Sequence, residues 1–396
     1  PIHSSAASDV YKRQSLFSII ATFAPAIGPA IGGWLTEHFS WHAIFYVNVL
    51  PSVVAWVLIQ RSMKHPIINW QIIRQGDFVG VVSVMMFLGT LEVILEKGGD
   101  ENWFDSRMIC VLAVLSAISF VIFVYDQIVH RNPLINIRLF KEYQYSYALL
   151  IFAMLGSAIY GTLFLVPYYL TMIHDYNATE IGHVVIWMGL PQLVILPMIP
   201  FLIRRYNPKY LIFIGFVGLA ISAFMDCHMN ADFAGPQMIA SMLVRALGQP
   251  FIMVPLSMLA TQNIKAEDAA SSAVLINVFR SLGGSMGTAV LSTYFTTRID
   301  FHLDSIKSTL LTGSQQFYHY LGEVKNLLVN QGLPSDSTNV QQTAVSILGE
   351  RMAIQSQIMA FNDLFMIMGI MMLATAIMVL CSNRDFQLQL KKEETA

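Results

Sequence analysis

The chain of 396 residues is 55% hydrophobic and only 12% charged, and its mean hydropathy is +0.57. A soluble domain carries about twice that share of charged residues, so the composition excludes an ordinary soluble protein and predicts a polytopic membrane protein. The formal net charge of −2 shows no basic excess, so no nucleic-acid partner is expected.

The first 14 residues, PIHSSAASDVYKRQ, are polar and show no periodic pattern. The stretch DVYKRQ is what the codons GAT-GTG-TAT-AAG-AGA-CAG encode, and these codons match the end sequence of a transposon adapter used in library preparation. We therefore predict that residues 1–14 are a non-native, adapter-derived segment, with a cytoplasmic loop as the alternative. No short apolar core with a small-residue cleavage site follows a charged start, so no signal peptide is predicted here.

Ten apolar runs follow, each long enough to cross a bilayer, which takes roughly 20 residues. The runs do not alternate between polar and apolar residues, as barrel strands would. Each run therefore predicts a helix, in which the backbone satisfies its own hydrogen bonds in lipid, and the fold class is all-α. The runs cover residues 16–35, 41–60, 77–96, 107–125, 145–168, 182–201, 209–228, 237–260, 272–296 and 359–381.

Basic residues in the short loops predict the orientation, because cytoplasmic loops carry an excess of Lys and Arg. If the first helix runs outward, thirteen basic residues fall on the cytoplasmic side and two, Lys97 and Arg107, on the outer side. The C-terminus is then cytoplasmic. The cytoplasmic set is Arg61, Lys64, Arg74, Arg131, Arg138, Lys141, Arg204, Arg205, Lys209, Lys265, Arg384, Lys391 and Lys392.

Two glycine-rich stretches stand out. In APAIGPAIGGW, Gly28 and Gly32 lie one turn apart, which lets a neighbouring backbone approach, and the prolines favour a bend. A packing seam and a hinge or gate are the two interpretations. The stretch NVFRSLGGSMGTAV repeats the device, which predicts two related bundles, as in transporters built from repeated halves. The residues are Ala24, Pro25, Gly28, Pro29, Gly32 and Gly33 in the first stretch, and Gly283, Gly284 and Gly287 in the second.

Polar residues inside the spans are costly in lipid and are candidates for function. Arg245 and Arg280 each lie about a third of the way into a span, from the outer and the cytoplasmic side respectively. Each either lines an aqueous cavity or snorkels to its interface. Asp363 is expected to cap a helix or bond between helices rather than carry protons. Buried amides are expected to tie helices together, with substrate contact as the alternative: Asn48, Asn277, Gln192 and Gln249.

Three further acidic residues, Glu92, Glu96 and Asp226, lie near outer helix ends and are expected to be solvated there. The connection 297–358 is polar, extracytoplasmic and far longer than an ordinary loop. Its last part, VQQTAVSILGERMAIQSQIMAFNDLF, has apolar residues at helical spacing. We predict a final helix that begins outside the membrane and continues into the last span.

No signature of an enzyme, metal or cofactor is found. His38 and His42 have helical spacing, but the stretch crosses a short loop and contains no third ligand, so a zinc site is not expected. The three cysteines lie far apart, which predicts neither a disulfide framework nor a metal site. No glycine-rich phosphate loop and no serine-centred elbow occur.

The stretch GPAIGGWLTEHFSWHAIFYVNVLP resembles the fifth-helix antiporter motif of the major facilitator superfamily, followed by the start of its sixth helix. The chain from residue 15 onward resembles the fourteen-helix drug:proton antiporter branch, the EmrB/QacA type. GDFVGVV, NPLINIRLFK, RALGQPFIMVPLSML and AASSAVLINVFRSLGGSMGTAV carry this likeness. Ala24 stands where the motif usually begins with glycine.

This resemblance implies that the ten spans are family helices five to fourteen. The helix-one carboxylate, the loop motif and the helix-four arginine of the family would then lie upstream. The implied division is 1–14 as the adapter-derived segment, 15–62 as the last two helices of the N-terminal bundle, 63–130 as two linking helices, 131–384 as a six-helix C-terminal bundle that contains the periplasmic loop 297–358, and 385–396 as a cytoplasmic tail.

The implied function is a proton-coupled multidrug efflux permease of the inner membrane that works by alternating access, present as an N-terminally truncated fragment. Its implied partners are amphipathic or lipophilic organic substrates, protons, the lipid bilayer, a periplasmic adaptor protein and an outer-membrane channel. The alternative within the superfamily is a proton-coupled solute or metabolite transporter with a non-drug substrate. A membrane-embedded enzyme or sensor would show clustered His, Asp and Glu at one membrane face, and a structural membrane protein would not need paired glycine stretches.

Overall fold

A computed structural model of the chain describes residues 28, 30–62, 76–130, 133–309, 315–330 and 338–382. These residues form helices and no strands, which confirms the all-α prediction. The α-helices are α2 (Ala43–Tyr46), α3 (Val49–Ser62), α5 (Phe78–Lys97), α6 (Arg107–Val129), α7 (Tyr143–His174), α8 (Ala178–Val185), α9 (Gln192–Ile195), α10 (Ile199–Arg205), α11 (Pro208–Met225), α12 (Gly235–Thr261), α13 (Ala269–Thr309), α14 (Gln315–Asn330) and α15 (Thr338–Cys381).

Short 3₁₀ helices connect or interrupt these elements. They are η1 (Trp103–Asp105), η2 (Ile137–Lys141), η3 (Ile186–Met188), η4 (Leu196–Met198) and η5 (Ala266–Asp268).

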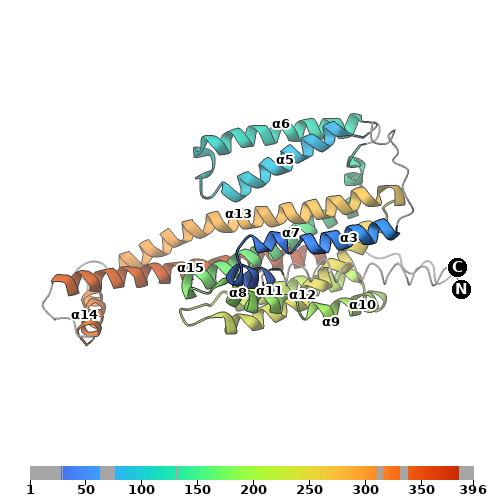
Figure 1. Ribbon diagram of the computed structural model, residues 1–396. Helices are drawn as coiled ribbons and strands as arrows, with labels where there is room; N and C mark the ends of the chain where they lie inside the picture. Colours follow the sequence, from blue (N-terminus) through green and yellow to red (C-terminus); the bar gives the residue numbers. More distant parts are fainter. Residues whose placement is uncertain are drawn as a thin grey trace.

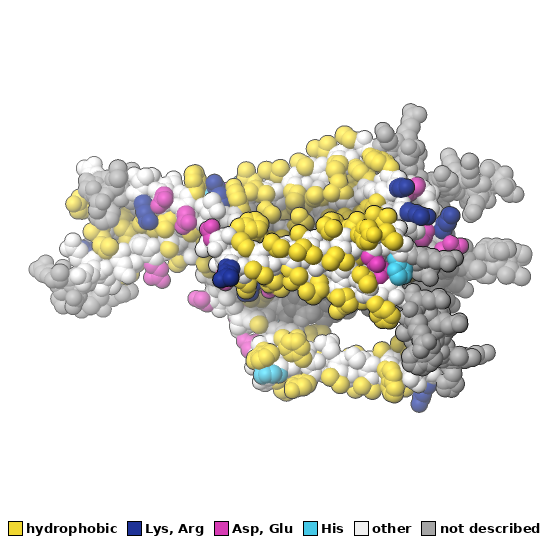
Figure 2. Space-filling view, turned by 90° about the horizontal axis from the view of Figure 1, so that it is seen from above, with side chains coloured by type: hydrophobic (Ala, Val, Ile, Leu, Met, Phe, Trp, Pro, Cys, Tyr) yellow, Lys and Arg dark blue, Asp and Glu magenta, His cyan; other side chains and the backbone are white. Residues whose placement is uncertain are grey.

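Nine segments within the described ranges are long and apolar enough to cross a membrane. They correspond to the second to tenth predicted spans. The first predicted span, 16–35, lies mostly outside the described residues, of which 30–38 are helical. Figure 2 shows hydrophobic side chains over the middle of one face, with most charged side chains near its two ends. This is the distribution expected of a protein that crosses a bilayer.

The span predicted at 182–201 is not one continuous helix. The structure divides it into α8, η3, α9, η4 and α10. Pro191, Pro197 and Pro200 lie in this stretch, and each proline removes one backbone donor and clashes with the preceding turn. The apolar run is therefore correct as a span, but its backbone is broken.

The long connection 297–358 contains more helix than expected. α13 continues to Thr309, well beyond the predicted end of the span at 296, and α14 lies inside the segment predicted as a polar loop. The extension is held by packing, because Phe295 and Ile299 contact the same core as Phe361 of α15. The predicted final helix is confirmed, since α15 runs without a break from Thr338 to Cys381. In Figure 1, α13 and α15 project beyond the other helices and α14 lies against α15.

The core of the bundle lies among α7, α11, α12, α13 and α15, whose closest pairs are α7 with α13, α11 with α12, and α11 with α15. Large side chains such as Tyr145, Phe152, Phe216 and Phe365 are fully buried there. α5 and α6 form a separate hairpin that lies along α13 (Figure 1). The Ser285 hydroxyl donates to the Glu92 carboxylate at 2.7 Å, and the Trp103 indole donates to Thr293 at 3.1 Å, which join the hairpin to α13.

The other end of this hairpin is closed by Asp77, the residue before α5. Its Oδ1 accepts from the Gly80 amide at 2.6 Å, and its Oδ2 accepts from the Gln127 side chain and the Leu134 amide. Burial raises the pKa of Asp77, but these hydrogen bonds outweigh it and hold the pKa below its ordinary value of 3.8.

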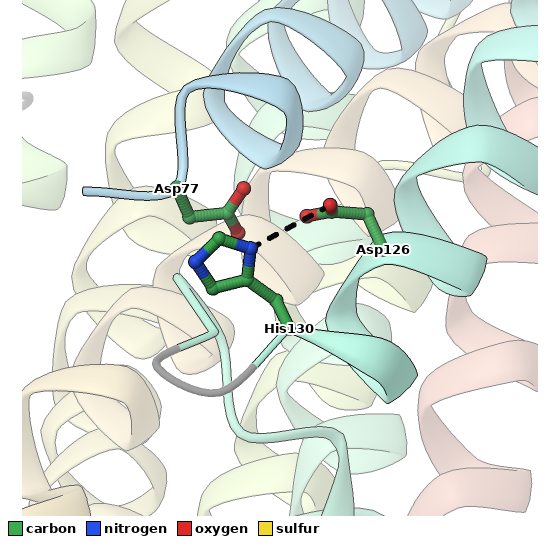
Figure 3. A group of neighbouring side chains, drawn as sticks. All are labelled: Asp77, Asp126 and His130. Atoms are coloured by element: carbon green, nitrogen blue, oxygen red, sulfur yellow. Dashed lines mark ion pairs between the residues drawn. The ribbon is translucent and has the colours of Figure 1, made fainter. Parts of the chain in front are cut away.

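Asp126 of α6 and His130, the residue that follows α6, lie beside Asp77 (Figure 3). One nitrogen or oxygen atom from each of the three side chains lies within 4.8 Å of the other two. Protein donors already occupy both oxygens of Asp77. His130 Nδ1 lies 3.8 Å from Asp126 Oδ1. The arrangement is therefore explained as a helix cap that ties α5 to α6.

Candidate functional site

The outer end of the bundle, as predicted from the basic residues, is the end at which α7 stops and α8 begins. The helical stretch 30–38 reaches α8 at this end. A Cβ atom on Gly33 would meet the backbone carbonyl of Ala178 in the first turn of α8. Gly33 therefore permits direct backbone contact between the first glycine stretch and the span that begins with α8.

The other residues of the first stretch behave differently. No described atom lies within 4 Å of a Cβ built on Gly28 or Gly32, so the close approach expected at these two glycines is not observed. The contact passes through Gly33 because it lies on a different side of the helix from Gly32. Ala24, Pro25 and Pro29 lie outside the described residues.

The second glycine stretch is a helix–helix contact between α13 and α7. A Cβ on Gly283 would meet the backbone of Ala153, and one on Gly287 would meet Ser157. Gly284 faces the Tyr160 ring. The Ser157 hydroxyl donates to the carbonyl of Gly283 at 2.5 Å. The absence of side chains on these glycines is therefore what lets α7 and α13 pack backbone to backbone.

Four residues at intervals of four form a stripe along α12, which we call the α12 stripe: Ser241, Arg245, Gln249 and Met253. At about 100° per residue, each step of four advances the stripe by about 40°, so it turns by about 120° over its length. The stripe consequently faces different helices in turn. Its partners lie on α11 near the outer end, then on α9, then on α13.

At the outer end of the stripe, Arg245 pairs with Asp226, the residue that follows α11. Arg245 Nη2 lies 3.7 Å from Asp226 Oδ2. Asp226 is 0% exposed and Arg245 is 3% exposed. The nearby Ser241 hydroxyl donates to the carbonyl of Met238, so neither Asp226 oxygen accepts a hydrogen bond from a described residue. Arg245 Nη2 likewise has no hydrogen-bond partner within the described part of the chain.

The middle of the stripe contacts α9. Gln192 Nε2 donates to Gln249 Oε1 at 3.2 Å and to the carbonyl of Met188 at 2.6 Å. Both glutamine side chains are buried. Pro250 follows Gln249 and removes the donor that the carbonyl of Ala246 would otherwise bind in a regular helix. The amide pair thus ties α9 to α12 at a point where α12 lacks one of its own hydrogen bonds.

At the inner end, the stripe meets α13. Arg280 Nη1 lies 4.0 Å from the Met253 sulfur, a weak acceptor, and Arg280 Nη2 donates to Asn277 Oδ1 at 3.0 Å. Arg280 Nε has no partner among the described residues. Three of the polar residues singled out from the sequence, Gln192, Arg245 and Arg280, therefore belong to the α12 stripe or contact it, and Asn277 joins them through Arg280.

Two of the polar residues are exposed rather than buried. Asn48 is exposed and its side chain donates to the carbonyl of Ile44 in the preceding turn, and no hydrogen bond from it to another helix is found among the described residues. Asn277 is exposed as well and donates to the carbonyl of Ala273 in α13. The buried position expected for these two asparagines is not observed.

Asp363 joins α15 to the extended part of α13. Its Oδ2 lies 2.6 Å from both Arg298 Nε and His302 Nε2. This contact is an interhelical bond near the outer end of the bundle, and it lies apart from the α12 stripe.

Asp226 is the residue whose part in this buried site was not predicted from the sequence. A carboxylate at the end of an apolar run was expected to be solvated, but Asp226 is fully buried. The segment after α11 folds over it, because Met229 is buried in the core and is tied to Asn362 of α15 through both its amide and its carbonyl. Its partner lies 19 residues away, and only the antiparallel packing of α11 on α12 brings the two together.

Comparison with known proteins places the chain in a family. The sequence model of the Major Facilitator Superfamily matches residues 3–288, a region that includes part of the stretch 1–14. The Colistin resistance protein EmrB of Acinetobacter baumannii is 26% identical over 373 residues, which are 93% of this chain and 71% of that protein.

Two further relatives are similar over most of the chain. The Multidrug export protein EmrB of Escherichia coli K12 is 25% identical over 360 residues, 89% of this chain and 67% of that protein. The Fatty acid resistance protein FarB of Neisseria gonorrhoeae is 23% identical over 354 residues, again 89% of this chain and 67% of that protein. Because the superfamily model matches well over half of the sequence, the chain belongs to the Major Facilitator Superfamily, a family of membrane transporters.

Proposed function

We propose that the protein is a proton-driven efflux transporter that exports amphipathic organic compounds by alternating access. The observation that carries this proposal is the contact of Gly33 with the first turn of α8. It places the stretch that resembles the antiporter motif against the C-terminal group of helices, at the predicted outer end. A backbone-to-backbone contact at this place can close the outer side of the transporter while a substrate is loaded from the other side.

The names of the relatives support export as the direction of transport. One of the similar proteins is named for colistin resistance, one for multidrug export and one for fatty acid resistance. Colistin and fatty acids differ in charge but are both amphipathic. This range favours an apolar, adaptable binding surface over a site that reads one functional group, and the 22 methionines and 25 phenylalanines of the chain can supply such a surface.

The second candidate is a proton-coupled transporter of the same superfamily that carries a polar solute or metabolite. The polar groups that meet the α12 stripe favour it, because the Gln192–Gln249 amide pair and the Arg280 guanidinium could fix the orientation of a polar substrate. The two candidates differ in substrate and share the proposed coupling to protons.

The setting of the protein is also part of the proposal. We place it in the inner membrane with the C-terminus in the cytoplasm, on the distribution of Lys and Arg in the loops. The ten predicted spans then correspond to family helices five to fourteen. The outward extension formed by α13, α14 and α15 is the surface on which a periplasmic adaptor protein, linked to an outer-membrane channel, would dock.

Accumulation of a lipophilic dye tests this function directly. The protein is expressed from its native locus in cells that lack their own efflux pumps. We expect a lower steady-state amount of dye in these cells than in cells without the gene, and full recovery of the dye signal when a proton uncoupler is added. Unchanged accumulation of every compound in a panel of toxic amphipaths would contradict export, and efflux that survives the uncoupler would contradict the coupling to protons.

A further inference from the structure

The buried pair of Asp226 and Arg245 is costly as it stands. Moving a carboxylate and a guanidinium out of water costs several kcal/mol for each ion, and a buried pair recovers this only with close contact and additional hydrogen bonds. Here the nearest charged atoms are 3.7 Å apart, and the atoms that form the pair, Asp226 Oδ2 and Arg245 Nη2, have no hydrogen-bond partner within the described part of the chain. Apolar side chains of similar size in place of this pair would stabilise the fold as well or better.

We propose that Asp226 is a proton-binding residue of the transport cycle and that its protonation releases Arg245 to act on the α12 stripe. This inference rests on the proposed function, since it assigns the coupling to a place within that transporter. The carboxylate takes one proton from the outer side and becomes a neutral acid. The guanidinium then loses its counter-charge but keeps its own positive charge, and it must find another acceptor.

The α12 stripe supplies that acceptor. Gln249 follows Arg245 by one helical turn, and its Oε1 accepts from Gln192. A carbonyl oxygen has two lone pairs, so Gln249 Oε1 can accept from Arg245 as well as from Gln192. A shift of Arg245 from Asp226 toward Gln249 changes the contact between α12 and α9. Met253, one turn further, contacts Arg280 of α13. Arg245 is thus a positioning residue between the proton and the helices that would enclose the substrate.

Within the described part of the chain, Arg245 is the one ion-pair partner that Asp226 has. From α12, Arg245 is the charged group and Ser241 the polar one. From α7, Tyr169 and His174 both bond to the carbonyl of Phe233. From α15, the acid is Asp363, which Arg298 and His302 already hold. The next residues in the chain are Cys227 and His228, whose side chains contact each other.

The place of the pair in the fold suits proton entry from outside. Asp226 follows the outer end of α11, and Arg245 lies ten residues into α12, about 15 Å from its start. The pair therefore sits between the predicted outer surface and the Gln192–Gln249 contact. Pro250 and Pro255 lie within α12 just beyond this point, and each one deprives a preceding carbonyl of its helical partner. A helix with such interruptions can bend where the stripe changes partners.

Protonation of Asp226 is measured without any transported substrate by infrared difference spectroscopy. The protein is expressed from its native locus, purified and reconstituted in vesicles. The pH is then lowered from about 8 to about 5, a range that spans the raised pKa values of buried carboxyl groups. We expect a C=O band of a protonated carboxyl that shifts when aspartate is labelled with ¹³C, is absent in Asp226→Asn, and persists in the matched control Asp232→Asn. Asp232 lies in the same loop but is exposed. A band that persists unchanged in Asp226→Asn contradicts the proposal.

Arg245 provides a second and directional readout. Removing its positive charge in Arg245→Gln favours the neutral acid, so the band should appear at a higher pH than in the wild type. Arg245→Lys keeps the charge and should leave the midpoint closer to that of the wild type. An unchanged midpoint in Arg245→Gln would show that the two side chains do not interact and would contradict the release step.

Transport assays distinguish a role of Asp226 in proton coupling from a purely structural role. In vesicles, Asp226→Asn should lose uptake of a lipophilic cation driven by a pH gradient but retain exchange of labelled for unlabelled cation at equal pH. Loss of both activities, with recovery of both in Asp226→Asn/Arg245→Gln, would identify a structural pair and overturn the proposal. If the wild type shows neither activity with any cation while the Asp226 band titrates as expected, the proposed function fails and the proton-binding assignment stands.

Discussion

Asp77 and Asp226 are two buried carboxylates of the same chain, and they differ in the number of hydrogen bonds that each carboxylate accepts. Asp77 accepts three hydrogen bonds, from Gly80, Gln127 and Leu134, which favour its ionised form. Asp226 accepts none from the described residues and faces one guanidinium at 3.7 Å. A carboxylate held by several donors is a structural element. A carboxylate that faces only one charged group can change its protonation state without breaking a network of hydrogen bonds.

The charge of Asp77 should stabilise the protein only above acidic pH. Since its pKa in the folded protein lies below 3.8, its contribution is present above that pH and is lost as the pH falls through the folded value. We expect Asp77→Ala, which also removes the cap of α5, to lower the free energy of unfolding by about 1 kcal/mol near neutral pH. Thermal unfolding of the purified protein in detergent between neutral and acidic pH measures this.

The matched variant is Asp77→Asn, which keeps a capping oxygen but not the charge. Its difference from the wild type should shrink as the pH falls below about 4, where the wild-type carboxylate becomes protonated. Asp100→Asn removes an exposed carboxylate near the other end of α5 and serves as the control. A difference between Asp77→Asn and the wild type that is the same at all pH values would contradict the assigned role of the charge.

Residue types predicted part of the candidate site, but geometry determined which of them act together. The cost of polar groups in lipid singled out Arg245, Arg280 and Gln192 before any fold was known. Spacing within α12 could have revealed the stripe, because its members recur every four residues. Asp226 could not be found this way, since an acid at the end of a span looks like a solvated helix end until the following segment is seen to cover it.

At the scale of elements, the two glycine stretches have different roles although they look alike in the sequence. Gly283, Gly284 and Gly287 face α7 within one bundle, where Ser157 adds a hydrogen bond. Gly33 faces α8, in a span that follows much later in the chain. Small residues predicted close helix contacts in both cases. The partner helix depends on how the helices are arranged in space, and the spacing of residues in the sequence does not reveal this arrangement.

A methyl group at Gly283 should separate α7 from α13. A Cβ there would meet the backbone of Ala153, which cannot move without shifting the helix. We expect Gly283→Ala to destabilise the protein by about 1–3 kcal/mol, the usual cost of overpacking a close contact. Gly89→Ala in α5 is the control, because no described atom lies within 4 Å of a Cβ at that position.

Thermal unfolding in detergent compares the two variants. The control should be as stable as the wild type or slightly more stable, since alanine favours a helix over glycine by up to about 1 kcal/mol. Equal stability of Gly283→Ala and Gly89→Ala would contradict the backbone contact between α7 and α13.

Most spans were predictable and most irregularities were not. Nine predicted runs coincide with helical segments because length and hydropathy are strong signals for lipid-spanning helices. The break between α8 and α10 follows from prolines that a hydropathy reading ignores. The extension of α13 to Thr309 depends on contacts with α15, and the sequence of a polar segment does not show what it will pack against.

At the scale of the whole molecule, the structure has a contact at its predicted outer end and a polar stripe in its interior. Gly33 brings the first glycine stretch against α8, and the α12 stripe connects α11, α9 and α13. Alternating access requires that such an outer contact opens in one half of the cycle and closes in the other. The separation of the two features supports the proposal that protons are bound at one place and substrate is enclosed at another.

The outer contact can be tested by adding volume on one glycine. Gly33→Val places a branched side chain against the backbone of Ala178, so the outer side should no longer close. We expect loss of net export in the dye assay with little change in the amount of protein in the membrane. Gly32→Val is the control, because no described atom lies within 4 Å of a Cβ there. Export that is equally impaired in both variants would contradict the specific contact at Gly33.

The central claim is that outward movement of an organic compound is exchanged against inward movement of protons. The most direct test uses vesicles that contain the protein and a trapped pH indicator, with an imposed pH gradient across the membrane. We expect that adding a compound exported in the dye assay dissipates the gradient in vesicles with the wild-type protein and does not do so in protein-free vesicles. A gradient that decays at the same rate with and without the compound would contradict the account.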